Sequence, residues 1–328
     1  MTPDFSACGN SFPFAAKCGI LPPTTAFGGE RPLNKQRKAD LLLVMVTAFW
    51  GASYFLTDLC LATMPPLSLN AFRFLVAFAV LGVVYFPKLR HISRKTLLYS
   101  CLIGASLVMV YTCYVYGILR TSISNAGFIC ALPVIFTPLL ELVIFRKKPG
   151  RRFAAALLLC TVGLALMTLG DSFRPAVGDI ICMGTAFFYA VDLLLTDRAV
   201  RDPEVDPLQL GVCQLGVVGF VMLLLTCLLE QPRLPQDGKT WGAALFLAVL
   251  CTGVAFVIQA VQQQYTSASH VGLIFTLEPL FSAIVAYFFA HEVLGLRGYI
   301  GAALMMLSLV LMEVDIGAWL KQKLTKKP

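Results

Sequence analysis

The chain has 328 residues, of which 58% are hydrophobic and 13% are charged, and its mean hydropathy is +0.79. Soluble domains carry about 25% charged and about 45–50% apolar residues. A soluble globule with this composition has too few polar side chains to cover its surface, which excludes soluble enzymes and nucleic-acid-binding proteins. The formal net charge of +8 is therefore interpreted segment by segment against a membrane.

The first 38 residues differ in composition from the rest of the chain. They are rich in Pro, Gly, Ser and Thr and end in a basic cluster of Lys35, Arg37 and Lys38. Prolines and a lysine interrupt their apolar stretch, so it lacks the continuous apolar core of a secretory signal. Residues 1–38 are predicted to be a disordered cytoplasmic tail, with an organellar targeting peptide as the alternative, and residues 317–328 a basic cytoplasmic tail.

Ten apolar segments follow the N-terminal tail. A bilayer core of about 30 Å requires about 20 apolar residues per helix, and lipid offers no partner to a free backbone N–H group. The predicted spans are 39–61, 66–86, 97–119, 122–145, 152–169, 176–197, 207–229, 241–263, 267–290 and 295–316. The expected fold class is an all-α integral membrane protein with ten transmembrane helices.

The Lys and Arg residues predict how these helices cross the membrane. With a cytoplasmic N-terminus, 20 of the 26 fall in cytoplasmic segments and five in outer loops, while Arg73 lies inside a span. Cytoplasmic loops of membrane proteins carry such an excess of Lys and Arg. We therefore expect a multi-pass protein of the cell membrane with both termini in the cytoplasm. A count of nine or eleven spans would destroy this alternation.

The two halves of the chain resemble each other. The matches, in the same order in both halves, are Thr47–Trp50 with Thr185–Phe188, Thr121–Gly127 with Thr266–Gly272, Pro133 with Pro279, and Gly150 with Gly295. They predict a first repeat at 39–170 and a second at 176–316, each of five spans. Because five is odd, the second repeat enters the membrane inverted, as in many secondary transporters. Pro133 and Pro279 are the predicted helix breaks for gating, and the two five-helix repeats are expected to surround a central cavity.

Four stretches carry a resemblance to a known family: 47–54 (TAFWGASY), 70–74 (NAFRF), 122–133, and 265–292 with Leu277-Glu278-Pro279 at its centre. They resemble the ten-span EamA-type family of the drug/metabolite transporter superfamily over residues 39–316. The resemblance implies a permease that moves small metabolites, amino acids or drugs by alternating access, with export as the expected direction. The first half has Leu132 before its proline, so a role for an acidic residue there carries over to Glu278 alone.

Ionisable side chains inside spans cost about 2.5–3.5 kcal/mol on insertion scales, so each one requires a reason. Glu278 precedes Pro279, which removes a backbone hydrogen bond and leaves a polar notch. The sequence predicts that Glu278 contacts substrate or carries a coupling proton, and the alternative is a bond to a neighbouring helix. Asp192, near the middle of its span, is predicted either to line the cavity or to join two helices.

Arg73 is expected to pair with Asp58 and join the first two spans, because a buried arginine usually finds a carboxylate. The alternative is that Arg73 binds a substrate carboxylate in a two-pronged contact. Glu141 lies five residues before Arg146 and is expected to extend toward the cytoplasmic loop.

Aromatic side chains complete the predicted substrate site. The candidates are Trp50, Tyr54, Tyr111, Tyr114 and Tyr189. Their rings combine an apolar face with a hydrogen-bonding group, which suits amino acids or aromatic drugs, although helix packing or interfacial anchoring is the alternative for each. Four embedded carboxylates and one Arg favour zwitterionic or cationic substrates, which leaves exchange of nucleotide sugars or sugar phosphates as the alternative function.

Other functional classes lack their motifs in this sequence. It contains no Walker, HExxH or GxSxG motif, and its 11 cysteines form no CxxC pair. An intramembrane enzyme and a channel are therefore secondary alternatives. No cofactor, metal or nucleic acid is expected; the expected partners are a small-molecule substrate and membrane lipid, with the protein a monomer or homodimer.

Overall fold

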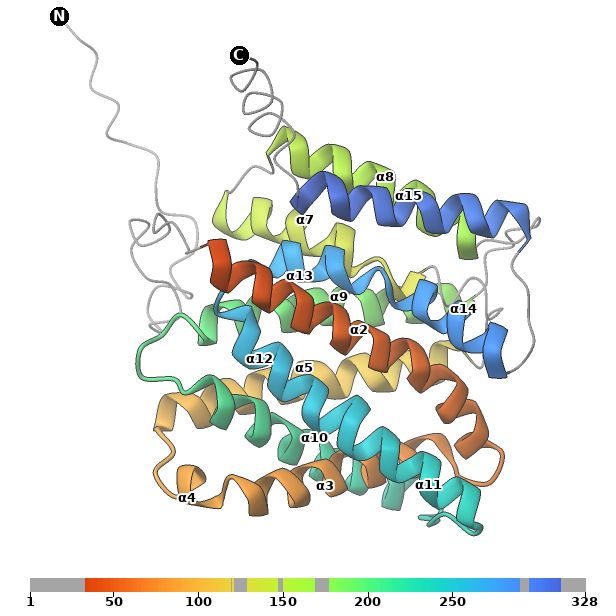
Figure 1. The fold of residues 1–328 in the computed structure, drawn as a ribbon. Coiled ribbons are helices and arrows are strands. Elements are labelled where there is room, and N and C mark those ends of the chain that lie inside the picture. Colours follow the sequence, from red (N-terminus) through yellow and green to blue (C-terminus); the bar gives the residue numbers. More distant parts are fainter. Residues whose placement is uncertain are drawn as a thin grey trace, which may run out of the picture.

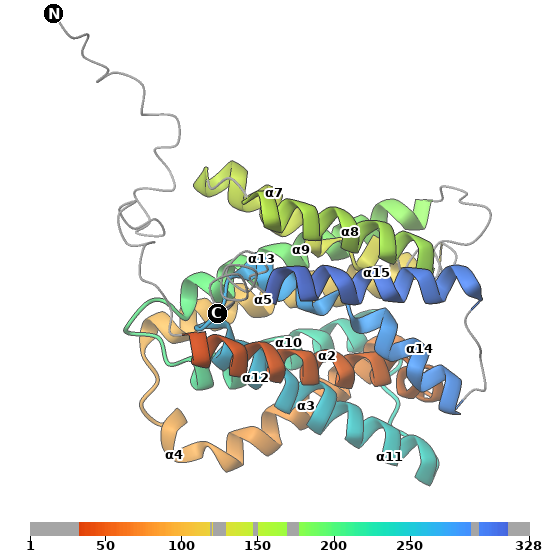
Figure 2. The ribbon, with the colours of Figure 1, turned by 45° about the horizontal axis from the view of Figure 1, so that its top comes forward.

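The computed structural model describes residues 33–118, 120, 129–146, 150–168, 177–289 and 295–313. In these residues every regular element is a helix, and the long helices lie side by side (Figures 1 and 2). The helices are α2 (Leu33–Leu61), α3 (Pro66–Val84), α4 (Phe86–Leu89), α5 (Arg94–Ile118), α7 (Pro133–Phe145), α8 (Arg151–Thr168), α9 (Val177–Ala199), α10 (Pro207–Leu229), α11 (Gly238–Phe246), the π-helix η1 (Leu247–Val254), α12 (Ala255–Gln263), α13 (Ala268–Phe275), α14 (Glu278–Phe289) and α15 (Leu296–Glu313).

The predicted apolar segments each overlap a described helix or a run of consecutive helices. Seven continuous helical stretches in the described residues are long and apolar enough to cross a bilayer, and α7 and most of α15 are shorter apolar helices. Large apolar side chains such as Val83 and Phe288 are 77% and 67% exposed. Apolar surface of this extent suits lipid rather than water. The protein is a multi-pass membrane protein whose described residues form helices and their connections.

Helix α2 begins at Leu33, six residues before the predicted span at 39. The basic residues Lys35, Arg37 and Lys38 therefore lie in the first turns of α2 rather than in an extended tail. The other predicted tail residues, 1–32 and 317–328, lie outside the described residues.

The halves pack against each other in matched pairs. Helices α3 and α10, the second helices of the two halves, pack together, as do α8 and α15, the last ones. Other contacts between the halves also occur in equivalent pairs. Helix α2 packs on α14, and its counterpart α9 packs on α7. Likewise α5 packs on α9, and the counterparts of α5, which are α11 and α12, pack on α2. Exchanging the two halves therefore reproduces the principal helix contacts.

Close approach of α2 and α14 depends on Gly51. A Cβ atom at this position would collide with the side chain of Phe281 and meet the backbone nitrogen of Ser282 at 2.8 Å. The glycine of the TAFWGASY stretch thus lets two helices from different halves touch, as small residues do between membrane helices.

A carboxylate fastens the two halves where α3 begins. Glu230, directly after α10, accepts hydrogen bonds from the backbone N–H groups of Leu67 and Ser68, with distances of 3.1–3.2 Å. These N–H groups belong to the first turn of α3, which has no partner for them inside the helix. Glu230 therefore caps a helix of the other half.

Candidate functional site

Each half contains a helix that is interrupted just before a proline. In the first half a turn at Ala131–Leu132 precedes α7, which begins at Pro133; in the second half Thr276–Leu277 separate α13 from α14, which begins at Glu278. The carbonyl groups of Leu132 and Leu277 accept from the N–H groups four residues later. The matched prolines thus stand at matched helix breaks. Broken helices of this kind often form the binding sites of transporters.

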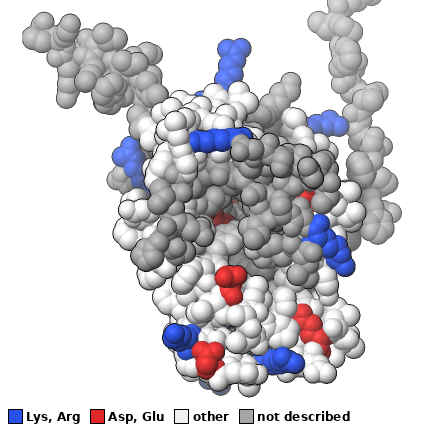
Figure 3. All heavy atoms as spheres, turned by 90° about the vertical axis from the view of Figure 1, so that its right-hand side faces the viewer, with Lys and Arg blue, Asp and Glu red and all other residues white. Residues whose placement is uncertain are grey.

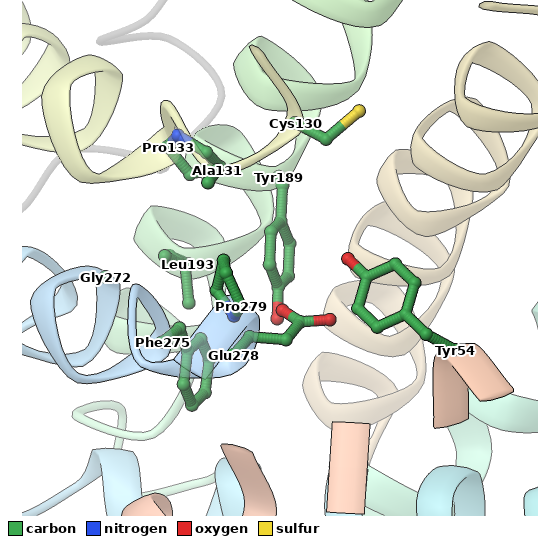
Figure 4. Close-up of a pocket in the computed structure, with 10 residues that line it drawn as sticks. All are labelled: Tyr54, Cys130, Ala131, Pro133, Tyr189, Leu193, Gly272, Phe275, Glu278 and Pro279. Atoms are coloured by element: carbon green, nitrogen blue, oxygen red, sulfur yellow. The ribbon is translucent and has the colours of Figure 1, made fainter. Parts of the chain in front are cut away.

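The two breaks line one cavity of about 30 Å³. The lining residues are Tyr54, Cys130, Ala131, Pro133, Tyr189, Leu193, Gly272, Phe275, Glu278 and Pro279 (Figure 4). They come from α2, α9 and both interrupted helices, so both halves contribute. Pockets for drug-sized ligands measure about 300–1,000 Å³, so this conformation holds the walls of the cavity close together.

Glu278 supplies a carboxylate to this cavity. In Figure 4 its carboxylate and the hydroxyl of Tyr54 point toward one another, and Tyr54 donates a hydrogen bond to it. Tyr189 stands beside the same carboxylate. Glu278 is half-buried and Tyr54 is 37% exposed, so the cavity reaches accessible surface at this corner. The predicted residues Glu278, Tyr54, Tyr189, Pro133 and Pro279 are therefore brought together.

An aromatic cluster lies next to the cavity. Its members are Trp50, Phe74, Tyr111, Tyr189, Phe256 and Phe275, three from each half. The Trp50 and Phe275 ring centroids are 4.7 Å apart in an edge-to-face arrangement, and the rings of Tyr189 and Phe275 are stacked at 6.2 Å. Trp50 and Tyr111 thus belong to the shell around the cavity rather than to its lining. Tyr114 is half-buried and lies near Tyr54 and Glu278.

The π-helix η1 is fastened to this cluster by side chains of the first half. Trp50 donates its indole N–H to the carbonyl of Cys251 at 2.8 Å, and the Cys251 thiol donates to the carbonyl of Phe49 at 3.2 Å. Arg73 donates from Nε to the hydroxyl of Thr252 at 2.8 Å. A π-helix replaces the usual backbone bonding over a short stretch and frequently occurs at functional sites.

Arg73 does not pair with Asp58, so that expectation is wrong. Arg73 is 5% exposed, whereas Asp58 is exposed at the surface of α2. The guanidinium instead lies over the ring of Tyr111, 5.6 Å from its centroid, and interacts electrostatically with Glu278. In the described part of the chain, its two terminal nitrogens make no hydrogen bond. Arg73 lies outside the cavity lining.

Asp192 is 1% exposed and lies outside the cavity lining. It accepts a hydrogen bond from Gln259 of α12, which joins two helices of the second half, while its Oδ1 has no hydrogen-bond partner among the described residues. Of the two interpretations of Asp192, the helix-joining contact is therefore the one present in this conformation.

Glu141 does not extend toward the cytoplasmic loop, contrary to expectation. Its carboxylate is buried and accepts a 2.6 Å hydrogen bond from Ser269, which joins α7 to α13. The next residue, His270, places its Nε2 atom 3.4 Å from Oδ1 of Asp40 on α2. These polar contacts near the starts of α2 and α13 were missed because Ser269 and His270 stand in an otherwise ordinary helix-start sequence.

Thr252, Cys251 and Gln259 were also missed as partners of the predicted residues. Thr252 and Cys251 form part of an apolar run with no local feature that signals a π-helix. Gln259 carried a usable signal, because an amide in the middle of a predicted span requires a partner within the protein.

The comparisons with known proteins agree with this architecture. The model of the EamA-like transporter family matches residues 37–169 and 176–314. An uncharacterized transporter of Archaeoglobus fulgidus is 24% identical over 282 residues, covering 86% of this chain and 88% of its own length. A second one, of Methanothermobacter thermautotrophicus, is 26% identical over 301 residues, covering 83% and 86%.

A solved structure, titled as the crystal structure of a protein, superposes with a TM-score of 0.71 at 18% identity. The superposition covers 84% of this chain and 96% of the other, and it establishes likeness of fold alone. The two family matches span most of the chain and divide it between α8 and α9. The chain belongs to the EamA-like transporter family of the drug/metabolite transporter superfamily.

Proposed function

We propose that the protein is a secondary transporter that exports small zwitterionic metabolites, with amino acids as the first candidates, by alternating access. The observation that carries the proposal is the cavity between two matched helix breaks, one from each half. Two similar halves around one site can rock to open it to either side of the membrane. Opening is required for any such substrate, because the present cavity is about 30 Å³.

The charges around the cavity favour a zwitterion. The carboxylate of Glu278 suits an ammonium group, and the free guanidinium nitrogens of Arg73 suit a carboxylate in a two-pronged contact. The aromatic cluster supplies an apolar wall. Among the described Lys and Arg residues, Arg73 is the buried one, which disfavours the alternative of sugar phosphates or nucleotide sugars, whose phosphates require several cations.

The proposed topology has ten crossings in two inverted repeats and both chain ends in the cytoplasm. It is supported by the matched packing of the halves and by the positions of α2 and α15, which begin and end on the same side of the bundle (Figure 1). The basic residues of 88–95 and 198–201 lie on that side. Figure 3 views the opposite side, where charged groups of both signs are scattered. The cell membrane is the proposed location.

Counterflow in proteoliposomes tests this function. Vesicles loaded with one unlabelled amino acid are placed in a trace of the same labelled amino acid, each of the 20 in turn. A transporter accumulates label transiently through exchange, whereas a channel gives no such overshoot. The proposal fails if no amino acid is exchanged while sugar phosphates or nucleotide sugars, run in parallel, are.

Substitution of Glu278 identifies the site within that assay. We expect Glu278→Gln to lose most of the exchange while the protein reaches the membrane in normal amounts, because it removes the charge and keeps the shape. Glu230→Gln is the matched control, since this carboxylate lies at a helix end outside the cavity lining. Wild-type exchange by Glu278→Gln would refute a role for the carboxylate.

A further inference from the structure

Three cysteines from separate helical segments lie around α9 near the cavity. Cys130 lies in the first-half helix break and lines the cavity, Cys182 lies on α9, and Cys113 lies near the end of α5. Cys130 packs against the small buried cluster of Ile129 and Cys182, and the two thiols are close enough to influence each other electrostatically. A Cβ atom on Gly184 would lie 3.1 Å from the Cys113 sulfur, so Cys113 packs against α9 two positions along the chain from Cys182.

The transport mechanism described above leaves these thiols without a role. Helix packing accounts for an isolated buried cysteine, which behaves as a small apolar side chain. It does not account for two thiols that pack into one cluster where the first-half break meets α9. The two thiols also differ in access, because Cys130 is half-buried at the cavity wall and Cys182 is fully buried.

We propose that Cys130 and Cys182 form a reversible disulfide that fixes the first-half helix break to α9. When transport opens the cavity, a small disulfide reaches Cys130, whose thiol loses its proton as it attacks, forms a mixed disulfide and releases one thiol. Cys182 then displaces the second thiol. In total two protein thiols lose two protons and two electrons, one S–S bond forms, and one molecule of the small disulfide is reduced to two thiols.

The disulfide should stop transport, and this part of the proposal rests on the proposed function. Alternating access requires the broken helix of one half to move relative to the other half. A covalent link from residue 130 to α9 joins the first half to the second at the cavity wall. Oxidation therefore arrests exchange, and a reducing agent restores it.

Peptide mapping of the full-length protein in nanodiscs tests the bond itself, with cystamine as the small disulfide. After oxidation, remaining thiols are blocked with N-ethylmaleimide and the chain is digested with trypsin. Cys130 is the sole cysteine between Arg120 and Arg146. Because Arg174 precedes a proline, Cys182 stays on one peptide with Cys160, so Cys160→Ser is included to assign the link.

We expect a cross-linked peptide pair in the wild type and in Cys113→Ser, and none in Cys130→Ser or Cys182→Ser. Dithiothreitol should remove it. The proposal is overturned if Cys130 stops at the mixed disulfide with cystamine or links to Cys113 instead.

Counterflow of oxidised and reduced protein tests the arrest separately. The oxidised wild type should lose most of its exchange and regain it with dithiothreitol, while Cys130→Ser and Cys182→Ser should be insensitive. A mapped bond with unchanged exchange would refute the arrest. If the reduced protein exchanges none of the tested amino acids, the proposed function fails, whereas the mapping still decides whether the bond forms.

Discussion

Glu230 shows how one side chain can connect distant parts of a membrane protein. Its carboxylate accepts from two N–H groups at the start of α3, where the helix dipole favours negative charge. The sequence does not reveal this contact between residues more than 160 positions apart. The donors are backbone N–H groups, which do not depend on the side chain.

We predict that Glu230→Ala lowers the free energy of unfolding by about 1–2 kcal/mol, because the first-turn N–H groups lose their acceptor. Glu230→Gln keeps an acceptor oxygen and should cost less. Thermal unfolding in detergent, followed by tryptophan fluorescence, measures both. Equal losses in the two variants would show that the hydrogen bonds are not the stabilising contact.

Arg73 and Thr252 give a second prediction for individual residues. Thr252→Val removes the hydroxyl that accepts from the buried guanidinium and should cost about 1–3 kcal/mol, because a buried donor is left unsatisfied. Thr252→Ser keeps the hydroxyl and should stay near the wild type. Chemical unfolding in detergent compares them, and a stable Thr252→Val protein would contradict the contact.

Asp237 adds a pH-dependent contribution at the start of α11. Hydrogen bonds from the Thr240 hydroxyl and backbone N–H lower the pKa of Asp237. A lowered pKa means that the charged cap stabilises the fold fully above the unfolded value of about 3.9 and loses that effect as the pH falls through the folded value. The difference in melting temperature between the wild type and Asp237→Asn, which caps without titrating, should therefore shrink below about pH 4. A constant difference from neutral to acid pH would exclude this contribution.

Helices and their breaks could be predicted to different extents. The apolar segments and the two prolines were sufficient to place the helices and the breaks at Pro133 and Pro279, since both depend on local composition. The π-helix η1 could not be predicted, because its bonding is set together with Trp50 and Arg73, which are far away in the chain. The Arg73–Asp58 pair was wrong because depth along two helices says nothing about which faces they turn to each other.

Helix contact at Gly51 gives a prediction for the packing of α2 on α14. Gly51→Ala places a Cβ atom against Phe281 and the α14 backbone and should cost about 1–3 kcal/mol. Gly242→Ala on α11 is the matched control: nothing lies within 4 Å of its added Cβ, and Ala favours a helix by up to about 1 kcal/mol. Melting temperatures should move in opposite directions. A neutral Gly51→Ala would mean that α2 and α14 can separate without loss.

The whole molecule combines the two halves so that most helix contacts have an equivalent. The internal sequence matches predicted two repeats, but they could not predict which helices meet, because membrane helices associate through shape and small residues rather than through hydrophobicity. One of the matched sequence stretches, residues 121–127, lies outside the described residues. The structure therefore shows the position of its counterpart at 266–272 only.

The topology gives a prediction for the intact molecule in cells. A membrane-impermeant maleimide should label Arg233→Cys in intact cells, whereas Lys88→Cys should react only after permeabilisation, with the unsubstituted chain as background. The two positions belong to opposite ends of the bundle in Figure 1. Labelling of both from the same side would refute the proposed crossing pattern.

The tight cavity has a consequence for pharmacology. A compound selected for shape against this conformation would have to be little larger than a water molecule or two, since the space in the cavity is about 30 Å³. Useful inhibitors should instead wedge the aromatic walls apart and trap a wider form. Their apparent affinity would then include the energy of separating rings such as Trp50 and Phe275, so screens should favour slow-binding compounds over rapid ones.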